Sequence, residues 1–463
     1  MDTWGYTLLS ASYLHQQFLM RRLTPQGAVA VAVAALLITA AAGVDTRQTL
    51  SYQIFALLLG LFAVGLLFVW RFSCPLKVER LLPRFGTVGQ TTQYRILVYN
   101  QSLRPLAGLQ LFEVFADPRP SFQELQIAIQ EADPTRKLPF LRRLMTSTIG
   151  QVGPEQWQKL IARKQAAKVR VLNFPPIPPK GRSEVVVELT PLYRGRVQFQ
   201  GVIIGRPDPF GLLNACRFLP LPQTLWLLPE RYPLAPIALE GFRRYQSGGV
   251  SLASTVGDTE EFRSLRDYRP GDPLRKIHWK SWAKVDKPIV KEEQDEFFVR
   301  HALILDTFQS QTYSEKLEAA ISIAASLVCN FHTEDALLDL MFVGTEAYCF
   351  TSGRSVGHIE QMLQILASVT ACMDKSFEYL TPVVLSRSHL LSGCICVFLT
   401  WDQTRSELVN YLQALHLPLR VFILQDDRQP VNFEEVPLTT DSSLIQWVKI
   451  DRLAESLAAA FGG

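Results

Sequence analysis

The sequence predicts a membrane-anchored protein of several domains, in which two transmembrane helices precede a β-sandwich and a doubly wound α/β domain. Three observations predict this class. Two long apolar runs lie near the start of the chain, short strands separated by turn residues follow them, and strands then alternate with helices. The expected parts are residues 1–75 for a tail and membrane hairpin, 76–228 for the sandwich, 229–299 for a charged segment and 300–463 for the α/β domain.

The composition limits the classes of partner. The formal net charge of the 463-residue chain is only +4, whereas a dedicated nucleic-acid binder normally shows a strong basic excess on one face. We therefore expect no nucleic-acid partner. The seven cysteines are odd in number, scattered and mostly set in apolar runs, which indicates buried free thiols rather than a disulfide framework.

The two apolar runs, residues 27–44 and 50–70, predict a hairpin of transmembrane helices. They contain 18 and 21 uncharged residues. A helix rises about 1.5 Å per residue, so each run covers about the ~30 Å hydrocarbon core. Basic residues flank both ends of the hairpin and predict that both termini lie in the cytoplasm, as a two-pass protein of the inner (plasma) membrane: Arg21, Arg22, Arg71, Lys77 and Arg80.

Two alternatives remain at this end of the chain. Ala40-Ala41-Ala42 resembles a signal-peptide cleavage site, although a cleaved first run would leave the second helix with the same orientation. The residues before the anchor, with Trp4, Tyr6 and Phe18 among them, form either a helix in the membrane interface or a loosely ordered tail.

Short strands predict an immunoglobulin-like β-sandwich over residues 76–228. The expected strands are residues 94–99, 109–115, 183–189 and 195–204. Residues 121–168 interrupt the strand pattern and predict two or three helices with many basic side chains. This insertion either touches anionic lipid or forms a solvated helical excursion packed on the sandwich, and its interspersed acidic and apolar residues favour the second interpretation.

The segment of residues 258–296 carries ten acidic and nine basic residues, interrupted by large apolar side chains. It is too charged for a core and too aromatic for a disordered linker. We expect it to lie across a surface, with buried aromatic anchors, and to bind another protein, because arginine, tyrosine and tryptophan anchor interfaces. The candidate interface residues are Phe262, Leu265, Arg266, Tyr268, Asp272, Arg275 and Trp279.

The run from Asp258 to Asp272, followed by Arg275-Lys276-Ile277-His278-Trp279-Lys280, resembles the signature of a bacterial family, domain of unknown function fifty-eight (DUF58). Tyr193-Arg194-Gly195-Arg196, Asp208-Pro209-Phe210-Gly211-Leu212 and the anchor hairpin resemble that family as well. The resemblance implies association with MoxR-type AAA+ ATPases in the assembly or maturation of other complexes. The helical insertion at 121–168 departs from the family pattern.

The α/β domain begins with a buried strand that ends in Asp306-Thr307-Phe308-Gln309-Ser310. This position resembles the D-x-S-x-S motif with which von Willebrand factor A domains hold Mg²⁺, but Phe308 replaces the middle serine. Mg²⁺ requires six oxygen ligands, and a phenyl ring supplies none. We therefore expect no metal and no other cofactor, with Asp306, Ser310 and Asp402 as the remnants of a degenerate Mg²⁺ site; a working Mg²⁺ site at these residues is the alternative.

The chain contains no phosphate loop, zinc motif or G-x-S-x-G elbow, and surface pairing or packing explains His278 better than base catalysis, because the sequence positions no plausible nucleophile for it. We expect a membrane-tethered adaptor or scaffold rather than an enzyme. The alternative is a membrane-associated hydrolase whose active site is assembled from distant residues.

Overall fold

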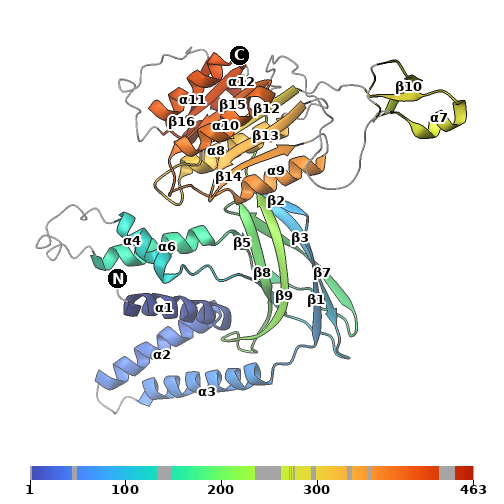
Figure 1. Ribbon diagram of the computed structural model, residues 1–463. Helices are drawn as coiled ribbons and strands as arrows, with labels where there is room; N and C mark the ends of the chain where they lie inside the picture. Colours follow the sequence, from blue (N-terminus) through green and yellow to red (C-terminus); the bar gives the residue numbers. More distant parts are fainter. Residues whose placement is uncertain are drawn as a thin grey trace, which may run out of the picture. The chain divides into compact units, whose positions relative to one another are not determined.

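The computed structural model divides the chain into two compact units, Met1–Pro229 and Glu230–Gly463 (Figure 1). The structure describes residues 3–43, 49–132, 149–234, 262–270, 272, 274, 277–293, 299–330, 336–352, 356–426 and 444–461.

Three helices open the first unit: α1 (Thr3–Arg22), α2 (Pro25–Gly43) and α3 (Thr49–Arg71). The Thr24 hydroxyl accepts the backbone N–H of Gly27 at 2.9 Å, and proline occupies the first position of α2, where no N–H is needed. Residues Tyr52–Arg71 are strongly apolar and almost entirely unburied, so among the described residues this is the one helix long and apolar enough to cross a membrane. Pro25–Ile38 is a shorter apolar stretch.

Two sheets follow and share one core. The four-stranded antiparallel sheet has the order β1-β3-β7-β5: Leu76–Leu81, Thr92–Asn100, Arg182–Pro191 and Ala167–Val169. The five-stranded sheet has the order β2-β9-β8-β4-β6: Phe85–Thr87, Asn214–Leu228, Gly195–Pro207, Gln110–Phe115 and Leu172–Asn173. Ile96 and Val187 from the first sheet and Ile204 and Leu227 from the second belong to the same buried cluster.

Strand β9 was not expected from the sequence, because Pro220 and Pro222 favour a turn over a strand. In the structure, β9 pairs with β8 along almost its whole length, and the register shifts between the pairs Phe199–Gln223 and Gly201–Pro220, so that Leu221 and Pro222 lie in a bulge. A bulge leaves a residue unpaired, so a proline without an N–H is tolerated there.

The helical insertion contains α4 (Phe122–Ala132) and α6 (Ile149–Lys164). Leu125 and Trp157 on these helices are buried. The insertion contacts α1, where the Tyr6 ring meets Phe122 and Trp157 edge-on, each with 5.7 Å between ring centroids.

The turn between β8 and β9 contacts both α2 and α3. Oδ1 of Asp208 accepts the N–H groups of Leu212 and Leu213 at 2.6 and 3.1 Å and so folds the turn on itself. A Cβ added to Gly27 would lie 2.0 Å from the Leu212 carbonyl oxygen, and one added to Gly65 would lie 2.7 Å from Oδ2 of Asp208. Glycine at these two helix positions allows the turn to reach both helices.

The second unit contains a mixed, mostly parallel sheet of six strands in the order β14-β13-β12-β15-β16-β17 (Figure 1). Only β14, at one edge, is antiparallel to its neighbour. Every residue of β15 is buried, as expected for a strand covered on both faces. The strands are Val299–Leu305 (β12), Ala336–Val343 (β13), Ala347–Ser352 (β14), Gly393–Phe398 (β15), Leu419–Gln425 (β16) and Ile445–Lys449 (β17).

Helices connect and cover these strands. They are α8 (Glu315–Asn330), α9 (Val356–Ser368), α10 (Leu380–Arg387), α11 (Gln403–Ala414) and α12 (Leu453–Phe461). The core on one face of the sheet joins Ile304, Val343 and Phe398 to residues of α10 and α11.

Candidate functional site

The charged segment forms a small folded module. Strands β10 (Phe262–Asp267) and β11 (Ile289–Glu293) pair in antiparallel fashion, and helix α7 (Trp279–Val285) lies between them in sequence (Figure 1). Ile277 bridges to Val290, and both side chains are buried. The segment therefore has its own small sheet, which the charge pattern did not predict.

An ion pair holds the turn that follows β10. The Arg266 guanidinium donates two hydrogen bonds to the Asp272 carboxylate, at 2.7 and 2.8 Å, and the backbone N–H of Arg269 donates a third at 2.9 Å. The Arg266 hydrogen bond, followed by that from Arg269, lowers the pKa of Asp272 to about 2. Asp272 is therefore ionised at every physiological pH.

The prediction of buried aromatic anchors in this segment is wrong for Trp279, whereas Tyr268 and Trp282 are half-buried. Trp279 is 64% exposed and stacks on Trp282, with 5.2 Å between centroids and 15° between ring planes. None of the seven residues of α7, all of which the structure describes, is buried. Two short strands and one helix enclose too little volume to bury two indoles. We call this apolar set the tryptophan surface; it consists of the exposed Leu274, Trp279 and Val285 and the half-buried Trp282.

The structure brings together some of the candidate interface residues. Arg266 and Asp272 are directly paired, and the Tyr268 N–H donates to the carbonyl of Pro288 at 2.9 Å. Phe262 begins β10, Leu265 is exposed on the same strand, and Trp279 begins α7. Arg275 lies outside the described residues.

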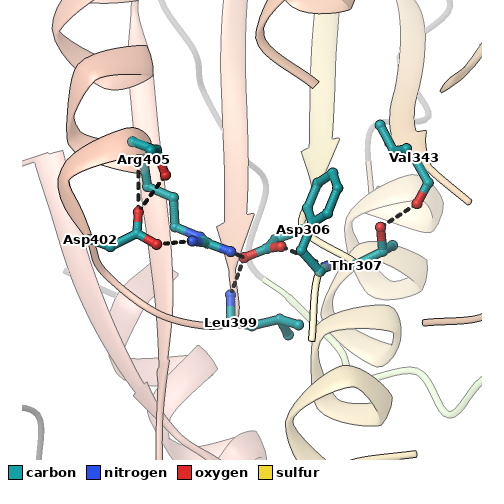
Figure 2. Close-up of polar contacts among 8 residues, drawn as sticks. Asp306, Thr307, Val343, Leu399, Asp402 and Arg405 are labelled. Atoms are coloured by element: carbon teal, nitrogen blue, oxygen red, sulfur yellow. Dashed lines mark hydrogen bonds and ion pairs between the residues drawn. The ribbon is translucent and has the colours of Figure 1, made fainter. Parts of the chain in front are cut away.

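The second site lies at the carboxyl end of β12, where the sequence predicted a degenerate metal site (Figure 2). Asp306 is fully buried. Its Oδ1 accepts the N–H of Phe308 at 3.0 Å, and its Oδ2 accepts the N–H of Leu399, at the end of β15, at 3.0 Å. Asp306 thus joins the ends of two neighbouring parallel strands.

Arg405, on the first turn of α11, completes this site (Figure 2). Its Nε donates to Oδ2 of Asp306 at 2.8 Å, and its Nη1 donates to Asp402. The guanidinium also lies 4.5 Å from the ring centroid of Phe377. Burial alone lowers the pKa of Arg405, but Asp306 and then Asp402 outweigh burial and raise it above its usual value.

A cation belonging to the chain therefore neutralises the carboxylate that the resemblance assigned to Mg²⁺. Asp402 is the N-cap of α11 and accepts the N–H of Arg405 at 3.0 Å. Ser310 lies exposed in the bend that follows β12. The arrangement does not fit Mg²⁺, because both oxygens of Asp306 already accept hydrogen bonds and Phe308 supplies no oxygen. Among the described residues, no group of three or more His, Cys, Asp or Glu side chains is placed to hold a metal ion.

Sequence reasoning missed Arg405. It lies 99 positions after Asp306, and long-range pairing leaves no local pattern. The available signal was its position three residues after Asp402, where an arginine reaches the N-cap carboxylate.

Comparisons with known proteins confirm the family resemblance over part of the chain. Residues 264–400 match the model of the family described as "Protein of unknown function DUF58". The matched range begins in β10 and ends after β15, so it includes the tryptophan surface and Asp306.

One curated relative is an uncharacterized protein, YeaD, of Bacillus subtilis (strain 168), which is 28% identical over 236 residues. The match covers 50% of this chain and 56% of the relative, so the chain spans little more than half of that protein's length. Among solved structures, two of Escherichia coli alpha-2-macroglobulin match 38% of this chain at 10–11% identity. They are matched over 9% and 22% of their own length, each with a TM-score of 0.19, which supports no conclusion about the fold.

Proposed function

We propose that this chain is a membrane-tethered cytoplasmic adaptor or scaffold that docks a partner protein through the tryptophan surface. The partner that the family resemblance implies is a MoxR-type AAA+ ATPase acting in the assembly or maturation of other proteins. The tether is the helical hairpin of α2 and α3, with both chain termini in the cytoplasm.

The observation that carries this proposal is the exposed indole of Trp279, which stacks on the half-buried Trp282 in a small folded module. Exposing large apolar side chains to water costs about 25 cal/mol for each Å² of apolar surface. Tryptophan and arginine are also the residues that most often contribute the largest share of binding energy at protein interfaces. The tryptophan surface is therefore suited to burial under a partner.

The Arg266–Asp272 pair supports the same proposal. Three hydrogen bonds to one carboxylate fix the turn between β10 and α7 before any partner arrives. Fixing a binding surface in advance lowers the entropy cost of association. The pair thus acts as a positioning element for the neighbouring tryptophans.

We also assign the two-sheet domain to the immunoglobulin-like sandwiches and the six-stranded domain to the von Willebrand factor A-like folds. Two sheets around one core support the first assignment. An aspartate at the carboxyl end of the first parallel strand supports the second. With Arg405 in the place of Mg²⁺, the latter domain serves as a scaffold rather than as a metal-dependent binding domain.

The test is co-purification from membranes with the tagged full-length chain. We expect Trp279→Ala to weaken binding of the ATPase by about 2 kcal/mol, roughly thirtyfold, and Arg266→Ala to weaken it as well. Tyr411→Ala is the matched control, since Tyr411 is also an exposed aromatic residue, on α11, outside the module. Unchanged co-purification with both module variants would remove the proposed interface.

The topology needs a separate check. A protease applied outside intact cells should leave the chain beyond Trp70 uncut. Cleavage there would place the sheets outside the cytoplasm and remove the proposed role.

A further inference from the structure

Helix α1 has one face bound to the helical insertion. Besides the ring contacts of Tyr6, its hydroxyl donates to the carbonyl of Pro120 at 3.1 Å. One turn further along α1, the Ser10 hydroxyl accepts a hydrogen bond from Arg119 at 2.7 Å. Tyr6, Ser10 and Tyr13 recur at helical spacing. Tyr13 lies close enough to the Asp117 carboxylate for the two side chains to interact electrostatically. These contacts orient α1 about its own axis.

A different face of α1 is apolar and exposed. Trp4 is 79% exposed and Leu8 is 66% exposed, and Leu14 and Phe18 are also exposed. Trp4, Leu8, Ala11, His15, Phe18 and Arg22 recur every three or four residues, so they form one stripe along the helix that is apolar except for His15 and the terminal Arg22, with Leu14 at its margin. The contacts of Tyr6 and Ser10 turn this stripe away from the insertion.

The charges of α1 indicate what covers the stripe. The helix contains no acidic residue and ends in Arg21 and Arg22. The Arg22 guanidinium lies 5.2 Å from the ring centroid of Phe18, so the cation continues the apolar stripe. An apolar stripe that ends in cations is typical of a helix that lies in the interface of an anionic membrane.

The chain also joins this stripe directly to the proposed anchor. Only Leu23 and Thr24 separate α1 from α2, and Leu23 forms a bridge with Leu213 of the β8–β9 turn. Exposed apolar residues continue along the next two helices: Val29, Leu36, Leu57, Leu66 and Trp70. A phospholipid bilayer offers the apolar and anionic surroundings that these residues match.

We propose that the stripe of α1 formed by Trp4, Leu8, Leu14 and Phe18 is a lipid-binding site that lies among the headgroups and upper acyl chains of an anionic bilayer. The contacts of α1 with the insertion of α4 and α6 then hold α1 in the orientation that turns this stripe toward the membrane. This inference rests on the membrane placement in the proposed function but not on the ATPase partner.

The test uses the full-length chain reconstituted into vesicles of phosphatidylcholine and phosphatidylglycerol whose acyl chains carry bromine, which quenches tryptophan emission on contact. The emission of Trp4 is the difference between the unaltered chain and Trp4→Phe. We expect brominated lipid to remove most of this difference. Trp157→Phe is the matched control, because Trp157 is buried on α6 and its emission should remain.

The emission of Trp70, at the end of α3, distinguishes failure of the lipid site on α1 from failure of the membrane placement. If the emission assigned through Trp70→Phe is quenched and that of Trp4 is not, the lipid site on α1 is wrong and the anchor stands, leaving a second copy or a soluble protein to cover the stripe. If neither is quenched, both the membrane placement and this inference are wrong. Equal quenching of Trp4 in vesicles of phosphatidylcholine alone would overturn the preference for anionic lipid.

Discussion

Two buried arginine–carboxylate pairs, one in each unit, use the same chemistry in different surroundings. In the first unit, Arg80 on β1 donates to Glu113 on β4 at 2.6 and 3.2 Å. The Tyr94 hydroxyl donates to the same carboxylate at 2.6 Å, and the Arg80 guanidinium lies 4.4 Å from the Phe199 ring centroid. Every charged atom of this pair is enclosed by the two sheets.

The pair in the second unit lies where a parallel sheet usually presents its ligand site. Arg405 bridges the buried Asp306 to Asp402, whose side chain is 46% exposed. Asp306 also accepts two backbone N–H groups, whereas Glu113 has only the Tyr94 hydroxyl besides Arg80 among the contacts described. The first pair is therefore part of a core, and the second lies at the carboxyl ends of parallel strands.

Breaking the enclosed pair should have the largest effect. Arg80→Met leaves Glu113 buried without its cation, and removing one partner of a buried ion pair typically costs about 3–5 kcal/mol. Denaturant unfolding of the protein in detergent micelles measures this loss. Arg95→Met is the control, because Arg95 pairs with Glu184 on the surface and should change stability by under about 0.5 kcal/mol. A loss below about 1 kcal/mol in Arg80→Met would show that the enclosure is not tight.

Breaking the Arg405–Asp306 pair, at the carboxyl ends of β12 and β15, should reduce the free energy of unfolding by less. In Arg405→Met, Asp306 keeps the N–H groups of Phe308 and Leu399, so we expect a loss of about 2–4 kcal/mol. The same unfolding experiment compares the two variants directly. A larger loss than that of Arg80→Met would contradict the proposed difference between the pairs.

Asp402→Ala should have a smaller effect again. It removes the N-cap of α11, which costs about 0.5–2 kcal/mol, while Arg405 keeps Asp306. Asp402→Asn preserves the cap acceptor and should lie close to the unaltered protein. If both variants lose equal stability, the charge of Asp402 matters more than its capping hydrogen bond.

The exposed pair of the module gives a pH dependence. The folded-state pKa of Asp272 is lowered from 3.8 to about 2, so its stabilising effect is fully present above about pH 4 and is lost as the pH falls through 2. The near-ultraviolet circular dichroism of the stacked indoles should therefore persist to about pH 2. The matched variant Asp272→Asn should lack this acid transition, and an identical transition in both proteins would assign it elsewhere.

Magnesium should have the smallest effect of all. Because the Arg405 guanidinium already neutralises Asp306, millimolar Mg²⁺ should leave the thermal midpoint of the unaltered protein unchanged relative to a chelator. An upward shift on adding Mg²⁺ would show that the metal competes with Arg405 for the site.

The parts of the fold that could be predicted from the sequence are those that depend on local composition alone. Residues 50–70 indicated an apolar helix because hydropathy depends on composition alone, and α3 spans Thr49–Arg71. The buried strand before Asp306 could also be predicted, because its residues are apolar. Strand β9 was not predicted, because the tolerance of Pro222 depends on a bulge in the pairing with another strand, β8.

In the candidate sites, too, features set by local sequence were predicted, and features set by the tertiary structure were not. The turn chemistry of residues 268–273 marked the place where Arg266 and Asp272 pair. The exposure of Trp279 was predicted wrongly, since exposure depends on how much volume the module encloses. Arg405 was missed, because its partner Asp306 comes from a different strand and a different part of the chain.

The contact of the β8–β9 turn with Gly27 and Gly65 has a mechanical consequence. The Leu212 carbonyl and the Asp208 carboxylate lie so close to α2 and α3 that the two helices and the sheets are joined without a slack linker. A change in the tilt of α2 or α3 should therefore displace the tip of the β8–β9 hairpin. Larger side chains at either glycine would wedge that joint apart.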